Sequence, residues 1–319
     1  MATDETNLEL DKSGSNKNNT TDYHVPVMLN EAIDGLNIQP NGTYIDCTMG
    51  GGGHTKEILK HLGDKGKLIA FDQDADAGKN VPKDERFIFV PQNFRHLNRF
   101  LKLYDGLPAD GLLADLGVSS HQFDEGDRGF SFRYDAALDM RMDQRGGRTA
   151  ADIANSYSAD QLQQMLSMYG EVTNAKTLAA ALVDAKKQRP YRSIQDLLNV
   201  LSPMAKGNPN KYYAQVFQAF RIEVNEEMEA LKEMLMQIPQ ALKSGGRAAI
   251  ITFHSLEDRM VKNFFKQGSF ETIEDDPLFG SRKVSPFKII SKKPIEPTDK
   301  ELKQNPRSRS AKLRVVEKV

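Results

Sequence analysis

The chain has 319 residues, of which 39% are hydrophobic and 27% charged, and its formal net charge is −1. This composition is typical of a soluble globular protein with one large domain or two ordinary ones. No apolar run approaches the roughly 20 residues that span a bilayer, and nothing at the N-terminus resembles a signal peptide. The single cysteine, Cys47, excludes an internal disulfide, and no Cys/His cluster has zinc-ligand spacing. We therefore expect a cytoplasmic protein with no membrane segment and no metal.

The charge is unevenly distributed along the chain. From residue 281 to the C-terminus, 12 Lys or Arg stand against 4 Asp or Glu, a surplus of +8, so the remainder carries −9. A basic tail on an acidic body favours a polyanionic partner that binds at one edge. The alternative is a tail whose charges only keep it in solution.

The first third of the chain predicts an α/β domain. Residues 1–22 are almost free of apolar side chains and predict a disordered tail. Residues 23–123 then alternate between helical patterns and short apolar runs, which predicts the first part of a doubly wound parallel sheet. The strands are expected at residues 44–46, 67–71, 86–91 and 111–115. Several of them end on an acid, and such acids gather at the carboxyl edge of a parallel sheet, where ligands bind.

A run of four glycines, Gly50–Gly53, follows the first strand, which ends at Asp46. The next strand ends at Asp72, whose carboxylate could accept hydrogen bonds from ribose hydroxyls. This is the order of a nucleotide-binding βαβ unit. The dinucleotide fingerprint fails because its third glycine falls on Thr55. The spacing is similar to the S-adenosylmethionine loop of methyltransferases, although Thr48 replaces the usual first glycine. A flexible glycine loop in another α/β protein is the alternative.

The α/β rhythm stops at about residue 124. Residues 124–210 are first charged and glycine-rich and then helical, with capping boxes that begin at Ser158 and Ser193. We interpret this region as an inserted helical domain that recognises the substrate. It is expected to interrupt the α/β domain, which resumes at residue 211.

Residues 211–319 predict the second part of the α/β domain. A long amphipathic helix is expected over residues 213–242, kinked or restarted at Pro239. A buried strand follows at 246–253, and then a helix capped by Ser255. Residues 287–290 and 311–319 predict a closing antiparallel hairpin within the basic tail.

Several stretches together carry a resemblance to one known family. They are HVPVML at 24–29, DCTMGGGGHT at 46–55, ADLGVSSHQFD at 114–124, RGFSFRYDAALDMRMD at 128–143, FQAFRIEVNEEMEAL at 217–231, GGRAAIITFHSLEDRMVK at 245–262 and NPRSRSAKLR at 305–314. The chain resembles the ribosomal RNA small-subunit methyltransferase H family, also called MraW, in order from residue 23 to 319.

The resemblance implies a class I S-adenosylmethionine-dependent methyltransferase fold with a helical insert. It also implies methylation of the exocyclic N4 of a cytidine in the decoding region of bacterial small-subunit ribosomal RNA. Carried over by motif, the expected cofactor-binding residues are Gly52, Gly53, His54, Asp72, Phe94, Asp115 and Gln122. The family usually has proline where this chain has His121, so the backbone before Gln122 is expected to differ.

Asp115 has two candidate roles at the end of the fourth strand. It could hold the methionine end of the cofactor, which we favour, or act catalytically as the acceptor for the target amine. The following residues lack the Asp/Asn-Pro-Pro-aromatic signature of many amino-methyltransferases.

Aromatic and basic residues after the fourth strand suit a surface that stacks bases and neutralises phosphates. The substrate-binding candidates are Arg128, Phe132, Arg133, Arg307 and Arg309. An ordinary loop whose aromatics fix the insert to the sheet is equally compatible with this pattern. Three other functions stay open: methylation of another nucleic acid, a dinucleotide-dependent oxidoreductase, and a non-catalytic nucleotide-binding module.

Overall fold

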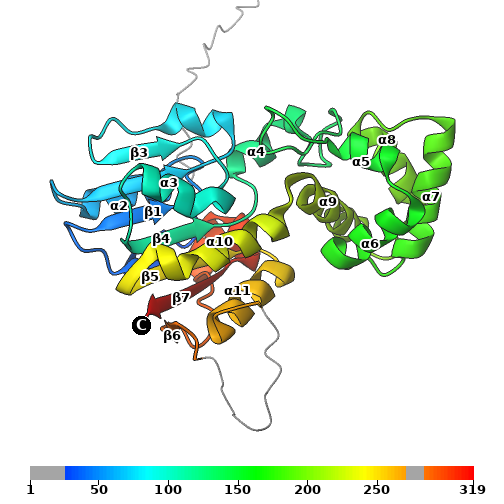
Figure 1. Ribbon diagram of the computed structural model, residues 1–319. Coiled ribbons are helices and arrows are strands. Elements are labelled where there is room, and N and C mark those ends of the chain that lie inside the picture. Colours follow the sequence, from blue (N-terminus) through cyan, green and yellow to red (C-terminus); the bar gives the residue numbers. More distant parts are fainter. Residues whose placement is uncertain (1–25, 271–283) are drawn as a thin grey trace, which may run out of the picture.

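The computed structural model describes residues 26–270 and 284–319, so the predicted N-terminal tail lies outside the described residues. Figure 1 shows a sheet covered by helices and, beside it, a lobe made only of helices. The sheet has the order β3-β2-β1-β4-β5-β7-β6 among the described residues. Its strands are β1 (Thr43–Asp46), β2 (Lys67–Phe71), β3 (Phe87–Val90), β4 (Ala109–Asp115), β5 (Leu242–Thr252), β6 (Phe287–Ile289) and β7 (Lys312–Lys318).

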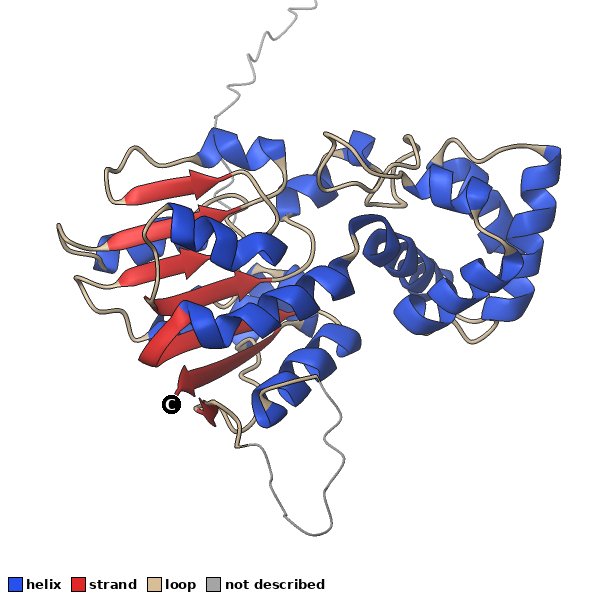
Figure 2. Cartoon of the chain, in the orientation of Figure 1, coloured by secondary structure: helices blue, strands red, loops and turns tan. Residues whose placement is uncertain are grey.

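The first five strands in sequence are parallel, and the C-terminal β7 is antiparallel to both β5 and β6. The predicted closing hairpin is therefore confirmed, and β7 also joins it to the main sheet. Strand β5 begins at Leu242, four residues before the predicted start. The doubly wound α/β fold expected from the sequence is confirmed (Figure 2).

Helices cover both faces of the sheet because successive side chains of a buried strand point to opposite faces. Leu112 and Ile250 lie in the cluster beneath α3 (Leu97–Leu103), α10 (Glu227–Ala241) and α11 (Ser255–Gln267). Their neighbours Leu113 and Ile251 pack on the other face, beneath α1 (Leu29–Leu36) and α2 (Gly53–His61). Strands buried on both faces explain the nearly continuous apolar runs in the sequence.

The helical lobe has its own apolar core. It contains α5 (Ala150–Ser156), α6 (Ala159–Gly170), α7 (Ala175–Gln188), α8 (Ile194–Leu201) and α9 (Pro209–Asn225). Ser158 and Ser193 form the predicted capping boxes with Gln161 and Asp196. Phe217 and Phe220 of α9 belong to this core, so it extends past the boundary at residue 210 expected from the sequence.

Shorter helices complete the connections. They are the 3-10 helices η1 (Ala75–Asn80), η2 (Phe94–His96), η3 (Gly126–Arg128), η4 (Ser202–Met204) and η5 (Pro306–Ser310), with α4 (Ser120–Asp124) and α12 (Asp299–Gln304).

Two details of the expected helices are wrong. The long helix breaks at Glu226, which adopts a left-handed backbone conformation with φ of 49°, and α10 then continues through Pro239 to Ala241. The cap of α11 is His254, which forms a capping box with Glu257, one residue before the predicted Ser255. An imidazole nitrogen here takes the position that a hydroxyl or carboxylate oxygen usually occupies.

We predict that Phe220→Ala lowers the free energy of unfolding by about 3–5 kcal/mol, because Phe220 is fully buried between α9 and the rest of the helical core. Urea unfolding followed by circular dichroism would measure it. Met236→Ala on α10 is the control, since Met236 is 56% exposed, and its loss should stay under about 0.5 kcal/mol. A loss for Phe220→Ala no larger than the control's would contradict this account of the lobe.

Candidate active site

The glycine run forms the turn between β1 and α2. Gly50 and Gly52 have φ of 48° and 76°, a region that residues with a Cβ rarely adopt. A Cβ on Gly53 would lie 2.1 Å from Cγ of Pro26, so only glycine lets this turn pack against the start of the described chain. Gly51 has open space on its Cβ side. The turn is thus a backbone cradle at the carboxyl edge of the sheet.

Asp46 at the end of β1 is a structural acid. Its carboxylate accepts hydrogen bonds from the Thr48 N–H at 3.0 Å and the Thr55 hydroxyl at 2.7 Å. Burial raises its pKa, and these donors partly offset the rise. Asp46 therefore stabilises the glycine turn, and each of its carboxylate oxygens already accepts a hydrogen bond.

Asp72 at the end of β2 holds the same turn from the other side. It accepts hydrogen bonds from the backbone N–H groups of Gly50 at 2.7 Å and Asp74 at 2.8 Å. Burial raises its pKa to about 6, and the neighbouring acids Asp74 and Asp46 add to the rise. Each oxygen retains a second lone pair for a ligand hydroxyl.

Asp115 at the end of β4 is an incompletely partnered buried acid. Its backbone N–H donates to the Thr48 hydroxyl at 2.7 Å, which ties β4 to the glycine turn. Its carboxylate atom Oδ1 is buried without a hydrogen-bond partner. Burial, followed by the negative charges of Asp46, Glu257 and Glu301, raises its pKa well above the usual value. A buried acceptor in this state favours a cationic or hydrogen-bond-donating ligand.

His54 lies next to Asp115 but does not form a working ion pair with it. Its Nδ1 is 3.8 Å from Asp115 Oδ2, whereas its Nε2 lies 3.1 Å from the Val27 carbonyl oxygen. Burial lowers the pKa of His54 to about 4, so the ring is neutral at pH 7. Because the ring is neutral, its approach to Asp115 is not an ion pair. We assign the single ring proton to Nε2, which donates to the Val27 carbonyl oxygen.

Six of the seven predicted cofactor residues line one cavity of about 640 Å³. They are Gly53, His54, Asp72, Phe94, Asp115 and Gln122. Gly52 does not line the cavity. It is the N-cap residue of α2, and its positive φ allows the chain to turn into that helix. The cavity size falls in the range of about 300–1,000 Å³ typical of small-molecule sites.

Gln122 is positioned by a capping box that was not among the sequence predictions. The Ser119 hydroxyl accepts from the Gln122 N–H, and Gln122 Oε1 accepts from the Ser119 N–H at 3.0 Å. The Gln122 amide then donates to Asp74 at 2.7 Å. The spacing of Ser119 and Gln122, Ser-x-x-Gln, is the sequence pattern that predicts such a capping box.

The prediction that Arg128 binds substrate is wrong. Its side chain is 8% exposed and pairs with Asp74 at 3.0 Å and Asp76 at 3.1 Å. It also donates to the carbonyl oxygens of Arg141 and Met142, both at 3.1 Å. Arg128 therefore joins the loop of the helical lobe to the cavity wall and is not available to phosphates.

The other substrate candidates differ in their surroundings. Phe132 is half-buried against Tyr213 and Phe217 of α9, as expected if aromatics hold the lobe together. Arg307 pairs with Asp124, stacks over Phe123 and lines the cavity.

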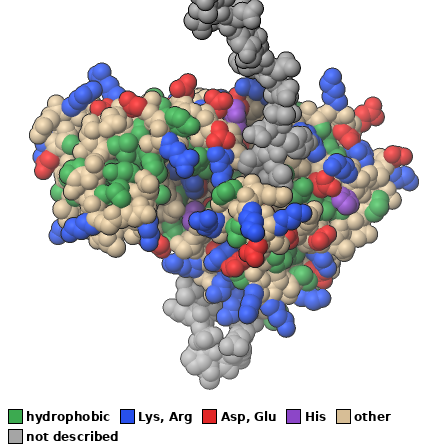
Figure 3. Space-filling model, turned by 180° about the vertical axis from the view of Figure 1, so that it is seen from behind, with side chains coloured by type: hydrophobic (Ala, Val, Ile, Leu, Met, Phe, Trp, Pro, Cys, Tyr) green, Lys and Arg blue, Asp and Glu red, His purple; other side chains and the backbone are tan. Residues whose placement is uncertain are grey.

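Arg133 and Arg309 are exposed. On the face shown in Figure 3, Lys and Arg side chains gather along the junction of the two lobes.

Further polar residues of α9, α10 and α11 line the cavity. Arg221, Asn225 and Glu227 come from the α9–α10 junction, and Glu257 comes from α11. Asn225 accepts from the Met142 N–H at 2.7 Å and donates to the Met140 carbonyl at 2.8 Å, so it fixes the same loop as Arg128. Arg221, Asn225 and Glu227 all lie in the stretch 217–231 that carries the family resemblance, but none of them was among the expected site residues.

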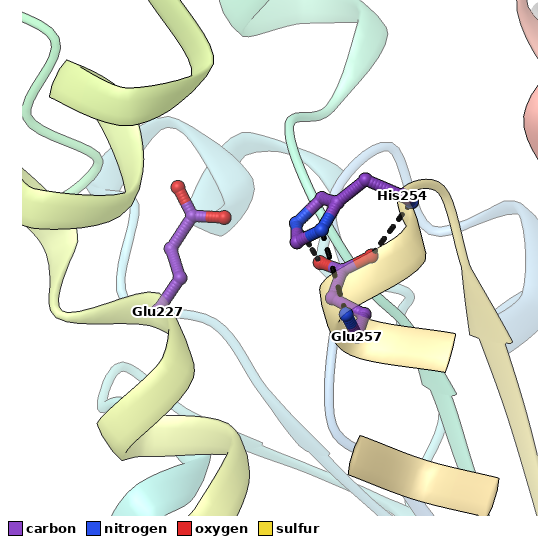
Figure 4. Close-up of side chains that lie close together, drawn as sticks. All are labelled: Glu227, His254 and Glu257. Atoms are coloured by element: carbon purple, nitrogen blue, oxygen red, sulfur yellow. Dashed lines mark hydrogen bonds and ion pairs between the residues drawn. The ribbon is translucent and has the colours of Figure 1, made fainter. Parts of the chain in front are cut away.

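Glu227, His254 and Glu257 bring possible metal-ligand atoms within 4.8 Å of one another (Figure 4). The donor set does not favour a cation, however. Arg221 donates to both oxygens of Glu227, at 2.8 and 3.0 Å. Glu257 Oε2 accepts from the Phe253 N–H at 2.8 Å. A guanidinium on one ligand already supplies the positive charge that a metal would bring.

None of the described helices is both long and apolar enough to cross a bilayer.

Comparison with known proteins gives consistent matches over almost the whole chain. A model of the MraW methylase family matches residues 21–319. A ribosomal RNA small subunit methyltransferase H from Parabacteroides distasonis is 56% identical over 93% of this chain and 98% of its own. The protein of that name from Cytophaga hutchinsonii is also 56% identical, over 93% and 99%. A putative methyltransferase structure from Streptococcus mutans in complex with SAH aligns over 92% of this chain and 99% of its own, at 14% identity and a TM-score of 0.40, too low to support an argument about the site.

We predict that affinity for S-adenosylhomocysteine falls by up to about tenfold per pH unit below pH 6. The pKa of Asp72 is raised to about 6, so above this pH the carboxylate accepts hydrogen bonds from ribose hydroxyls, and below it the acid becomes protonated. Calorimetric titration between pH 5 and 8 would measure the change. Asp72→Asn should bind weakly with a flatter profile, and an equally steep profile in this variant would assign the titration to another group.

We predict that Arg128→Ala lowers the free energy of unfolding by about 3–5 kcal/mol, because it leaves the buried carboxylate of Asp74 without its cation. Chemical denaturation would measure it. Arg145→Ala is the matched control on the same loop. Arg145 pairs with Asp143 but is 47% exposed, so its loss should stay within about 1 kcal/mol. Equal effects of the two substitutions would contradict the structural role of Arg128.

Proposed function

Because this chain belongs to the MraW methylase family, we propose that it methylates the N4 atom of a cytidine in the decoding region of small-subunit ribosomal RNA, in the cytoplasm. S-adenosylmethionine is the methyl donor. The observation that carries the proposal is the cavity in which a glycine turn and the acids Asp72 and Asp115 converge. The full-length relatives that carry the methyltransferase name support the choice of substrate.

The residues of the cavity fit the proposed cofactor. Asp72 has lone pairs for the two ribose hydroxyls, and the glycine turn lets the ligand approach the backbone. The buried Oδ1 of Asp115 has no protein donor, which suits the ammonium of the methionine end. Two positive groups on the cofactor would offset the cost of burying these carboxylates.

Bound S-adenosylmethionine supplies an activated methyl group. The residues of this chain must hold the target amine in line with that group and exclude water. The amine of cytosine is a weak nucleophile because its lone pair is delocalised into the ring. Acceptors around the N–H groups favour attack by taking up the developing positive charge. The unpartnered Oδ1 of Asp115 is an acceptor of this kind, so the catalytic role for Asp115 is the second candidate after the cofactor role.

The target base must leave its stack to reach a buried methyl group. Arg307 lines the cavity and lies on η5 within the basic C-terminal region. Arg133 and Arg309 are exposed. We assign these three arginines to phosphates that flank the target nucleotide, where each contact would be weakened by salt.

The proposed function predicts methyl transfer to small subunits isolated from cells that lack this protein. Mass mapping of the RNA should place one N4-methylcytidine in the decoding region. Methylation at another base, or none, would refute the proposal.

Asp115→Asn separates the two roles of that acid. If Asp115 holds the ammonium, the substitution should weaken cofactor binding by about tenfold or more, as expected for a lost charge-assisted hydrogen bond. Calorimetry and single-turnover rates would be measured separately. Unchanged binding with lost turnover would assign the acid to the target amine instead.

A further inference from the structure

Two segments far apart in the sequence meet at one end of the cavity. Arg221 and Glu227 come from the α9–α10 junction, and Glu257 comes from the first turn of α11, which follows β5. In the sheet order, β5 lies on the opposite side of β4 from β1 and β2. Glu257 therefore lies beyond Asp115 as seen from the glycine turn, and a carboxylate oxygen of Glu227 lies within 4.8 Å of one of Glu257.

The Arg221–Glu227 pair is only partly used within the protein. The guanidinium donates through Nε and Nη2 to the two oxygens of Glu227, at 2.8 and 3.0 Å. Among the hydrogen bonds of the described residues, none uses Nη1 of Arg221. Each carboxylate oxygen of Glu227 can accept one more hydrogen bond. The side chains are 17% and 10% exposed and line the cavity, so the pair offers a ligand one acceptor beside one donor.

Near this end of the cavity, two buried polar atoms make no hydrogen bond within the described residues. They are Oδ1 of Asp115 and Nε2 of His254. Nε2 nevertheless has a charge partner, because it lies 3.1 Å from Glu257 Oε1, and His254 does not line the cavity. Figure 4 shows Glu227 facing His254 and Glu257 from the other side of this space. Buried polar atoms are rarely left unpaired, so the free Oδ1 of Asp115 indicates that the cavity takes a polar ligand.

We propose that Arg221 and Glu227 form the subsite that reads the Watson–Crick edge of the target base. Cytosine presents an amine donor beside the ring acceptor N3, which matches a carboxylate beside a guanidinium. Glu227 accepts from the exocyclic amine, and Arg221 donates to N3. Uracil presents a carbonyl and an N–H in the same order, so each of its groups would meet a group of its own kind. The inference rests on the proposed function, because it supplies the base recognition that this function requires.

The first test measures base recognition without ribosomal RNA. Protein saturated with S-adenosylhomocysteine is titrated with cytidine monophosphate, uridine monophosphate, and the 2-pyrimidinone ribonucleotide that lacks the exocyclic amine. Wild-type protein should bind the cytidine nucleotide about tenfold more tightly than either of the others, which corresponds to one lost hydrogen bond. Glu227→Gln and Arg221→Lys should lose this preference.

Arg95 and Glu233 provide a matched control. Arg95 donates through Nε and Nη2 to both oxygens of Glu233, each at 2.9 Å, and Glu233 lies on the same helix as Glu227. This pair does not line the cavity. Glu233→Gln and Arg95→Lys should therefore keep both the nucleotide preference and the rate of methyl transfer. Glu227→Gln should lower kcat on small subunits at least about a hundredfold, with unchanged affinity for S-adenosylhomocysteine.

The outcomes separate this inference from the proposed function. Equal or absent binding of the three nucleotides by wild-type protein overturns the subsite, even if small subunits are methylated. A preference lost equally in the control pair also overturns it, because the effect would then be a general one on helix packing. A cytidine preference that depends on Glu227, in a protein that does not methylate small subunits, supports the subsite and refutes the proposed function.

Discussion

The burial of several carboxylates at one edge of a parallel sheet is the constraint on which the rest of the site depends. Asp46, Asp72 and Asp115 end three strands of this sheet. Such charges are tolerated only when hydrogen bonds or cations compensate them. The backbone N–H groups of Gly50 and Asp74 compensate part of Asp72, and a hydroxyl compensates part of Asp46. The carboxylate of Asp115 is the least compensated of the three, because its Oδ1 has no hydrogen-bond partner. This uncompensated acceptor makes the cavity suitable for a positively charged ligand.

Where the two lobes meet, arginine side chains compensate buried carboxylates. Arg128 neutralises Asp74 and Asp76, and its Nη2 also donates to carbonyl oxygens of the loop that Asn225 binds. Arg221 neutralises Glu227 at the helix break. Both arginines are largely buried, and each connects a residue of the α/β part with the helical lobe. The arrangement of the lobes is thus fixed by the same paired charges that shape the cavity.

Local sequence signals were sufficient for the sheet, the glycine turn and the acids, because each of these depends on residues close together in the chain. The expected role of Arg128 failed for the opposite reason. Its burial depends on Asp74 and Asp76, more than fifty residues earlier, and no pattern around Arg128 reveals that contact. The break at Glu226 was also hidden, since a glutamate gives no local signal for a left-handed backbone. Pro239 predicted a kink or a helix end, but α10 continues through it, with Ile238 and Ala241 packed in the core on either side.

The break at Glu226 makes the number of residues between Arg221 and Glu227 important for the cavity, in addition to their identity. An α-helix advances about 100° per residue, so one residue inserted between Arg221 and the break would turn Arg221 by more than a quarter of a turn relative to Glu227. Arg221 lies six positions before Glu227, on the other side of the break, and the same insertion would carry it out of the cavity. The length of the segment from Arg221 to Glu227 therefore matters for the cavity as much as the charges of these two residues do.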